Sequence, residues 1–163
     1  MDGNEVRTAS LVAATLTTGL MAGLLYGYAC SVMPALRRVD DRTFIEVMQR
    51  INVAILNGWF FLGFLGTLLL TALTLVLHLV GGPRPGTYPV AAAFVLYLAV
   101  LGVTRGFNIR LNAELAAAGP PDQIDDPAPV RHRFEAPWVR WHLVRTVLAT
   151  LALACLCWAL TLD

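Results

Sequence analysis

The sequence predicts an all-α fold, an integral membrane four-helix bundle with an amphipathic helical segment between spans one and two. Hydrophobic residues make up 57% of the 163 residues and charged residues 14%, against roughly 25% charged in a soluble domain. Four runs contain no Asp, Glu, Lys or Arg: residues 8–36, 51–83, 85–104 and 146–162. Since a helix needs roughly 20 apolar residues to cross a bilayer core, each run predicts one span. The whole chain, residues 1–163, is expected to form a single transmembrane domain.

The first span is expected at about residues 10–33. Pro34 closes it in this prediction, because proline cannot donate the hydrogen bond of a continuing helix. Gly19, Gly23 and Gly27 recur every four residues within the span. Helices in lipid associate by van der Waals packing, so small residues at this spacing predict a face that another helix can approach closely.

The segment after span one is charged and returns to helix before span two. Thr43 and Glu46 have the spacing of a capping box, which predicts a helix start. The apolar side chains that recur on one face of this helix are Phe44, Met48, Ile51 and Ile55. We therefore expect an amphipathic helix that leads into the second span.

The remaining spans are expected at about residues 59–80, 88–107 and 138–161. Gly102 and Gly106 form a second close-approach pair in the third span. Residues 119–129 contain four prolines and three aspartates, which predicts a long irregular loop. The helix of span four is then expected to begin near Pro137.

The distribution of arginine predicts the orientation of the bundle. Ten of the twelve arginines lie in or beside the two long loops, and only Arg7 and Arg84 lie on the opposite side. The positive-inside rule places arginine-rich loops in the cytoplasm. We therefore expect a bacterial plasma membrane protein with loops 34–58 and 105–140 in the cytoplasm and both termini outside.

Three groups of polar and aromatic side chains lie at the cytoplasmic ends of three helices. The groups are Gln49, Asn52 and Asn57 before span two, Arg105, Asn108 and Asn112 at the end of span three, and Trp138, Trp141, His142 and Arg145 at the start of span four. Polar side chains at membrane depth are costly and by default mark a function. A bundle brings such stripes together around one cavity, so the three groups predict a shared site.

The individual residues also have ordinary structural interpretations. An asparagine near a helix end is often a cap or an interhelical hydrogen-bonding group, and an arginine such as Arg145 can extend to lipid headgroups. Metal sites need several donors on facing helices, and His142 has no carboxylate at ligand spacing. No phosphate-binding loop or dinucleotide fingerprint is present, so neither a metal nor a bound cofactor is expected. A net charge of +1 likewise predicts no nucleic-acid partner.

Three segments of the chain resemble a known family. Residues 32–36 (VMPAL) and 48–57 (MQRINVAILN) look like the first signature of the anthrone oxygenase-like membrane proteins. Residues 107–112 (FNIRLN) are similar to the family's N-x-P-L-N motif, and residues 138–146 (WVRWHLVRT) to its W-x-x-W-N-x-x-R-T motif. Two positions depart from these patterns: Arg110 stands at the usual proline, and His142 stands at the usual asparagine.

The resemblance implies a cofactor-independent monooxygenase. Such an enzyme uses O2 to convert the activated methylene of a lipophilic aromatic polyketide, an anthrone, into a quinone carbonyl. A substrate that becomes an electron-rich carbanion can itself donate an electron to oxygen. The protein then supplies a base, charge stabilisation and a dry pocket, and the membrane lipid supplies a phase in which the substrate dissolves.

Roles for the candidate residues follow from side-chain type. His142 is the general-base candidate, since imidazole titrates near neutrality. Arg145 and Arg105 would stabilise an enolate or peroxide anion. The residues expected to bind the substrate through amides or rings are Asn52, Asn57, Asn108, Asn112, Phe107, Trp138 and Trp141. Two alternatives stay open: a cofactor-free cyclase or isomerase of a lipophilic natural product, and a non-catalytic protein that binds a lipid or partner. The sequence leaves the oligomeric state undetermined.

Overall fold

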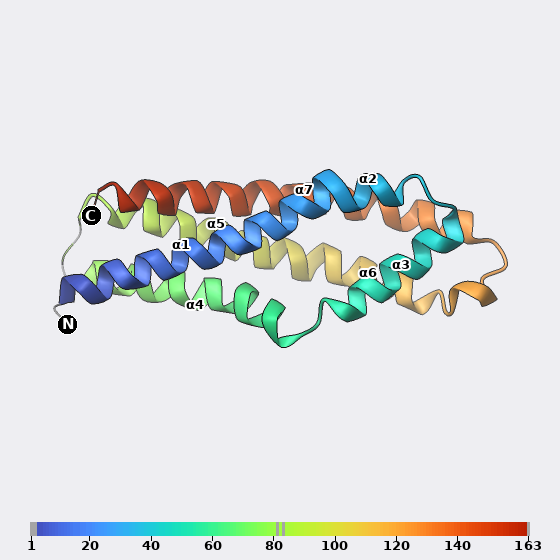
Figure 1. Cartoon of the computed structure of the whole chain (residues 1–163), viewed down its shortest axis with the longest axis horizontal. Helices are drawn as coiled ribbons and strands as arrows, with labels where there is room; N and C mark the ends of the chain where they lie inside the picture. Colours follow the sequence, from blue (N-terminus) through green and yellow to red (C-terminus); the bar gives the residue numbers. More distant parts are fainter. Residues whose placement is uncertain (1–2, 81, 83, 163) are drawn as a thin grey trace.

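The computed structural model of the chain describes residues 3–80, 82 and 84–162, and every regular element among them is helical (Figure 1). The elements are α1 (Gly3–Gly27), the π-helical turn η1 (Tyr28–Val32), α2 (Met33–Leu36), α3 (Asp41–Ala54), α4 (Gly58–Val80), α5 (Thr87–Val103), the π-helical turn η2 (Thr104–Asn108), α6 (Ile109–Ala117), the 3₁₀ turn η3 (Pro121–Gln123) and α7 (Pro127–Leu160).

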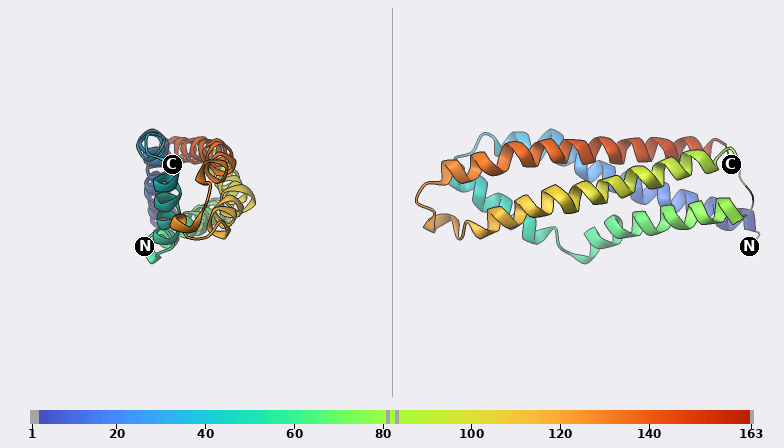
Figure 2. Two further views of the ribbon diagram at one scale, coloured as in Figure 1. Left: turned by 90° about the vertical axis from the view of Figure 1, so that its right-hand side faces the viewer. Right: turned by 180° about the vertical axis from the view of Figure 1, so that it is seen from behind.

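Four continuous helical rods in the described part of the chain are long and apolar enough to cross a membrane: Gly3–Leu36, Gly58–Val80, Thr87–Ala117 and Pro127–Leu160. Helix α1 packs against α4 and α7, and α5 packs against the same two helices. The four rods therefore lie side by side around a common long axis (Figure 2). The predicted four-helix membrane bundle is confirmed, with α3 as the additional helix between the first and second rods.

Pro34 does not end the first helix, which continues to Leu36. The π-helical turn η1 ends at Val32, two residues before this proline. A proline ring clashes with the carbonyl four residues earlier, here that of Cys30, and a wider turn relieves the clash without breaking the rod. The predicted end at residue 33 was therefore wrong by three residues. The helix ends where the charged residues begin.

The helix start at α3 also differs from the prediction. Asp40, not Thr43, is the N-cap: its carboxylate accepts hydrogen bonds from the Thr43 backbone N–H at 3.0 Å and from the Thr43 hydroxyl at 2.6 Å. The Thr43 hydroxyl and amide bonds lower the pKa of Asp40. Glu46 instead forms an ion pair with Arg50 at 2.5 Å. The amphipathic pattern is confirmed, because Phe44 and Met48 are fully buried.

The fourth rod is longer than predicted. Helix α7 begins at Pro127, ten residues before Pro137, which lies inside the helix. Residues 119–129 are correspondingly less irregular than expected, since η3 and the first turn of α7 occupy part of them. Arg42 holds the remaining loop against α3 by donating to the backbone carbonyls of Pro121 and Ile124, the latter at 2.9 Å.

A partly buried arginine joins the base of α7 to the connection between α2 and α3. Arg131 donates to the carbonyls of Leu36 at 3.3 Å and Val39 at 2.8 Å, and to the carboxylate of Asp41 at 2.9 Å. Its guanidinium carbon lies 4.5 Å from the centre of the Phe44 ring. These contacts fix α3 against α7 at one end of the bundle.

The predicted small-residue faces are largely unused within the chain. A Cβ at Gly19 would touch Leu153 at 3.7 Å, but among the described residues nothing lies within 4 Å of one at Gly23, Gly27, Gly102 or Gly106. The closest approach is at Gly63, which was not predicted and where a Cβ would lie 3.0 Å from the Met21 sulfur. Residue spacing identifies a helix face that carries small residues. Which of these residues contacts another helix depends on where that helix lies.

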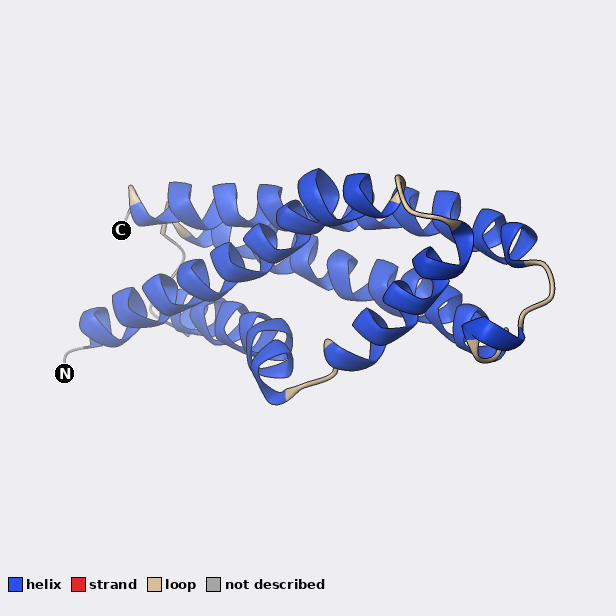
Figure 3. Cartoon of the chain, turned by 45° about the vertical axis from the view of Figure 1, so that its right-hand side comes forward, coloured by secondary structure: helices blue, strands red, loops and turns tan. Residues whose placement is uncertain are grey.

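Helices α3 and α4 do not form one continuous rod. Residues 55–57 separate them, and Figure 3 shows this segment as a loop on the outer side of the bundle. Asn57 links the two helices, because its amide nitrogen donates to the Ala54 carbonyl at 2.8 Å and its amide oxygen accepts from the Phe60 backbone N–H at 3.0 Å. The interruption leaves room between this segment and the other rods.

Candidate functional site

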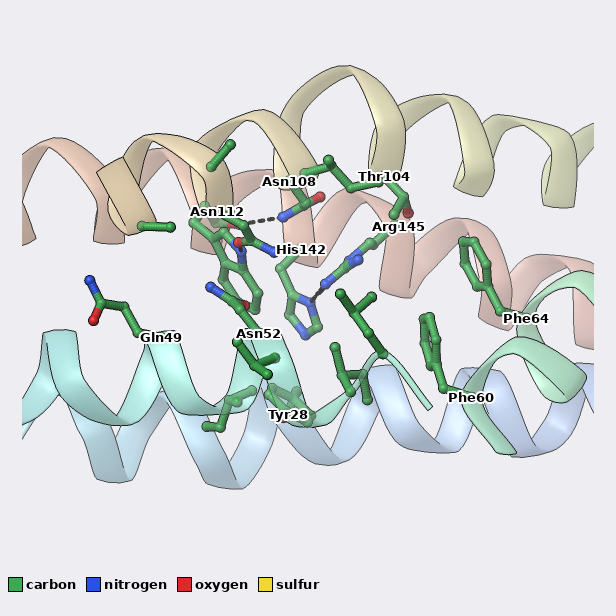
Figure 4. A pocket seen from close by; sticks show the side chains of 18 of the residues that line it. Tyr28, Gln49, Asn52, Phe60, Phe64, Thr104, Asn108, Asn112, His142 and Arg145 are labelled. Atoms are coloured by element: carbon green, nitrogen blue, oxygen red, sulfur yellow. Dashed lines mark hydrogen bonds between the residues drawn. The ribbon is translucent and has the colours of Figure 1, made fainter. Parts of the chain in front are cut away.

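A cavity of about 730 Å³ lies beside the interruption between α3 and α4. Side chains from η1, α3, α4, η2, α6 and α7 line it, so every rod contributes (Figure 4). Most of the lining is aliphatic or aromatic. Concave, mainly apolar cavities of this size with a few polar groups are the usual form of a small-molecule site.

Six of the ten site residues expected from the sequence line this cavity. They are Asn52 from α3, Asn108 from η2, Asn112 from α6, and Trp138, His142 and Arg145 from α7. Figure 4 shows the labelled members of this group around one space. The three polar stripes therefore meet at one level of the bundle, and the roles of these side chains remain predictions.

The other four expected residues, Asn57, Arg105, Phe107 and Trp141, lie elsewhere. Asn57 is an exposed cap of α4, and the Arg105 side chain is exposed outside the cavity. Trp141 stacks on Phe107 outside the cavity, with ring centroids 3.5 Å apart and planes at 10°. The π-helical turn Thr104–Asn108 explains the position of Arg105. Its wider turn breaks the 3.6-residue spacing on which the predicted shared face depended.

Hydrogen bonds to both ring nitrogens fix the orientation of His142. Its Nε2 lies 3.0 Å from the Leu25 carbonyl oxygen, which can only accept, so Nε2 carries the hydrogen. Nδ1 lies 3.2 Å from Arg145 Nε and 3.0 Å from Arg145 Nη2, which can only donate, so Nδ1 is the acceptor. Trp138 stacks on the imidazole with centroids 4.8 Å apart and planes at 9°. The contacts assign a neutral ring with a defined tautomer.

Among the described residues, Arg145 is the one charged side chain that lines the cavity. Within the described chain no carboxylate forms an ion pair with it, in contrast to Arg131, which pairs with Asp41 and Glu135. A cation in apolar surroundings is costly unless an opposite charge or strong acceptor accompanies it. The cavity is therefore electrostatically suited to an anion or to a ligand that develops negative charge.

The model of the anthrone oxygenase family matches residues 59–155, more than half of the chain. The chain belongs to the anthrone oxygenase family. No curated protein and no solved structure matches it. The matched segment includes the cavity residues of η2, α6 and α7, whereas Tyr28 and Asn52 precede it.

Two buried amide atoms in this anthrone oxygenase family member have no hydrogen-bond partner among the described residues: Asn52 Nδ2 and Asn108 Oδ1. The other Asn108 atom, Nδ2, donates to the Trp138 carbonyl at 3.4 Å, and Asn112 accepts from Trp138 Nε1 at 2.8 Å. An unsatisfied buried polar atom costs about 1–3 kcal/mol. Both asparagines line the same cavity as Arg145, so its lining contains one donor and one acceptor without a partner among the described residues.

Several lining residues were not expected from the sequence. Tyr28 enters through the π-helical turn η1, and its ring centroid lies 6.0 Å from that of His142. Phe60 and Phe64 stack at 5.1 Å and 15° to form an aromatic wall. The spacing of four residues between the two phenylalanines could have predicted that they share one face of α4. It would not have placed them in a cavity, because aromatic side chains in an apolar span are equally typical of a lipid-facing surface. Thr104 in η2 also lines the cavity, and no feature of the sequence around it predicts this position.

Exposed apolar side chains surround the outer side of the cavity. Val53, Leu56, Phe61 and Ile109 line the cavity and are 74%, 63%, 44% and 54% exposed. These side chains border the α3–α4 interruption and η2–α6. An apolar border of this kind matches the hydrocarbon of a bilayer rather than water.

The described residues contain no group of three His, Cys, Asp or Glu side chains that could hold a metal ion. The cavity's own polar groups are amides, hydroxyls, one imidazole and one guanidinium. This set can donate hydrogen bonds and stabilise negative charge on oxygen. It suits acid–base or oxyanion chemistry on an organic ligand.

Proposed function

We propose that the chain is a cofactor-independent monooxygenase that uses O2 to oxidise an activated methylene of a lipophilic aromatic substrate of the anthrone type. The observation that supports this most strongly is the position of the Arg145 guanidinium in an apolar, aromatic-walled cavity, where no carboxylate of the described residues pairs with it. This arrangement supports a reaction that passes through an organic anion. Membership of the anthrone oxygenase family supports the same general kind of function.

The proposed reaction begins with transfer of a proton from the methylene between two aryl groups to hydroxide or water, because such a methylene is acidic enough to ionise without a protein base. The resulting carbanion spreads its charge onto the conjugated carbonyl oxygen, which Arg145 and the spare N–H of Asn52 would bind. The carbanion gives its electrons to O2 and forms a carbon–oxygen bond, and protonation gives a hydroperoxide. Loss of water then leaves a carbonyl, so one oxygen atom enters the product and the other enters water.

The size and lining of the cavity support a flat substrate. Its volume of about 730 Å³ falls within the roughly 300–1,000 Å³ typical of small-molecule sites. The stacked pair Phe60 and Phe64 and the indole of Trp138 offer planar surfaces to aromatic rings. The apolar border of the cavity supports entry from the membrane, into which such a substrate partitions.

The loops at the cavity end of the bundle are proposed to face the cytoplasm. The support is the arginine distribution, ten against two across the two ends, and the positive-inside rule. With this orientation the substrate, whether dissolved in lipid or newly made in the cytoplasm, would reach the cavity near the inner membrane surface.

Oxygen consumption tests the proposal. The chain purified in detergent with a metal chelator would be mixed with an anthrone, and O2 uptake and quinone formation would be recorded together with ¹⁸O2. We expect uptake of one O2 per quinone and one labelled oxygen atom in the product. A rate no greater than that of heat-denatured protein would refute the proposal. Conversion of the substrate without O2 uptake would indicate the cyclase or isomerase alternative.

A further inference from the structure

We infer that His142 is a positioning residue, which holds the Arg145 guanidinium toward the cavity by accepting its N–H bonds at Nδ1. The inference rests on the proposed function, since it assigns His142 a part in that reaction. It differs from the general-base role predicted from the sequence. As a positioning residue, His142 accepts hydrogen bonds at Nδ1, whereas as a general base it would take up a proton at that same atom.

The imidazole is held too firmly to serve only as a lining group. His142 is 1% exposed. Its Nε2–H donates to Leu25 on α1, its face stacks on Trp138, and the Tyr28 ring lies 6.0 Å from its centroid. Contacts from two rods therefore determine the direction in which Nδ1 points. The lone pair of that atom is directed at Arg145.

Arg145 needs such a fixed acceptor. A long side chain without a carboxylate partner has many rotamers, and ordering it costs conformational entropy. Two of its five N–H bonds, from Nε and Nη2, converge on Nδ1 of His142. The other three have no protein partner among the described residues, so they remain for the oxygen of a ligand. His142 thereby orders the guanidinium and leaves its binding edge free.

The same geometry opposes a base role for His142. Nε2 already carries a hydrogen that the Leu25 carbonyl accepts. A proton on Nδ1 would face two N–H bonds and place an imidazolium about 3 Å from a guanidinium in apolar surroundings. Proton transfer to His142 would therefore require this arrangement to be broken first.

Two substitutions separate the roles. In His142→Asn the amide oxygen stands two bonds from Cβ, as Nδ1 does, so it can accept from Arg145 but cannot take a proton near neutral pH. We expect His142→Asn to keep kcat within about threefold of the unmodified chain, with an unchanged pH profile. His142→Leu, which has no acceptor, should lower kcat by about 10²-fold, the usual effect of losing one preorganised donor. A fall of about 10²–10⁴-fold in His142→Asn, the effect of a lost acid–base group, would overturn the inference.

A spectroscopic measurement tests the geometry without relying on turnover. Protein labelled with ¹⁵N-histidine in detergent micelles at neutral pH would be examined by NMR, and His142→Asn would identify the signals of residue 142. We expect hydrogen on Nε2 and a hydrogen-bonded, unprotonated Nδ1 whose signal moves in Arg145→Leu. Hydrogen on Nδ1, or a signal unaffected by Arg145→Leu, would overturn the inference. If the unmodified chain consumes no O2, the proposed function fails, while this spectrum still decides how His142 and Arg145 are arranged.

Discussion

Replacing Arg145 by leucine tests the electrostatic basis of the proposed reaction. Arg145 is the one charged side chain among the described residues that line the cavity, so the substitution leaves no other cation of that lining to stabilise a developing oxyanion. Losing one preorganised donor costs about 10²–10³-fold in kcat, or about 2.7–4 kcal/mol of transition-state stabilisation. Since Arg145 supplies both donors and charge, we expect a fall in kcat of about 10³-fold. The assay is steady-state O2 uptake with an anthrone in detergent micelles.

The same substitution should have little effect on folding. Leucine removes a cation that has no carboxylate partner in the described chain, and removing an unpaired charge from apolar surroundings is favourable. It also leaves Nδ1 of His142 without its donor, at a cost of about 1–3 kcal/mol. These effects oppose each other, so the unfolding midpoint should remain close to that of the unmodified chain. A loss of turnover would then reflect chemistry rather than stability.

Two further variants control the experiment. Arg110→Leu removes an exposed arginine that pairs with Glu114 outside the cavity, and it should leave turnover unchanged. Arg145→Lys keeps the charge but replaces the planar fork with a point charge, so it should restore only part of the lost rate. Undiminished turnover in Arg145→Leu would refute the argument that the cavity acts through its one cation.

Three other outcomes can be measured. Asn112→Leu removes the acceptor of a buried indole N–H and should lower the free energy of unfolding by about 1–3 kcal/mol; an unchanged thermal midpoint in detergent would contradict this. Arg131→Met removes a partly buried arginine with its ion pairs and its hydrogen bonds to backbone carbonyls, and it should cost about 3 kcal/mol. Arg133→Met, at an exposed position, should cost little in the same melt. A cysteine at Asp125 should resist a membrane-impermeant maleimide in intact cells, whereas one at Arg84 should react; the reverse labelling would invert the proposed orientation.

The positions of six site residues could be predicted because membrane depth restricts polar side chains. Asn52, Asn112 and Arg145 are far apart in the sequence, but each lies at the same end of its apolar run. In a bundle of helices that lie side by side, residues at the same membrane depth come close together. The level of the cavity along the bundle therefore follows from where the apolar runs of the sequence end. Asn57 and Trp141 fulfil the same depth criterion and still lie outside the cavity. Asn57 caps α4 from the loop before it, and Trp141 stacks on Phe107 instead, because depth does not determine the face of a helix.

The sequence by itself determined the membrane class, the four rods and the depth of the cavity that six candidate residues line. Charged side chains are costly in hydrocarbon whatever the details of packing, so their positions along the chain are enough to locate the four membrane-spanning helices. Residues such as Gly23 and Pro34 carry weaker information. The effect of the glycine depends on whether another helix lies against it, and the effect of the proline depends on whether the turn before it can widen. The residues next to them in the sequence do not determine either condition.

Only the tertiary structure decided which faces meet. The π-helical turns at Tyr28–Val32 and Thr104–Asn108 change the phase of two rods, and a spacing rule based on 3.6 residues cannot anticipate them. The bond from His142 to Leu25 spans 117 residues of sequence, and the absence of a carboxylate beside Arg145 in the described chain depends on every rod around it. Such contacts depend on the relative rotation of packed helices, so they exist only once the bundle has formed.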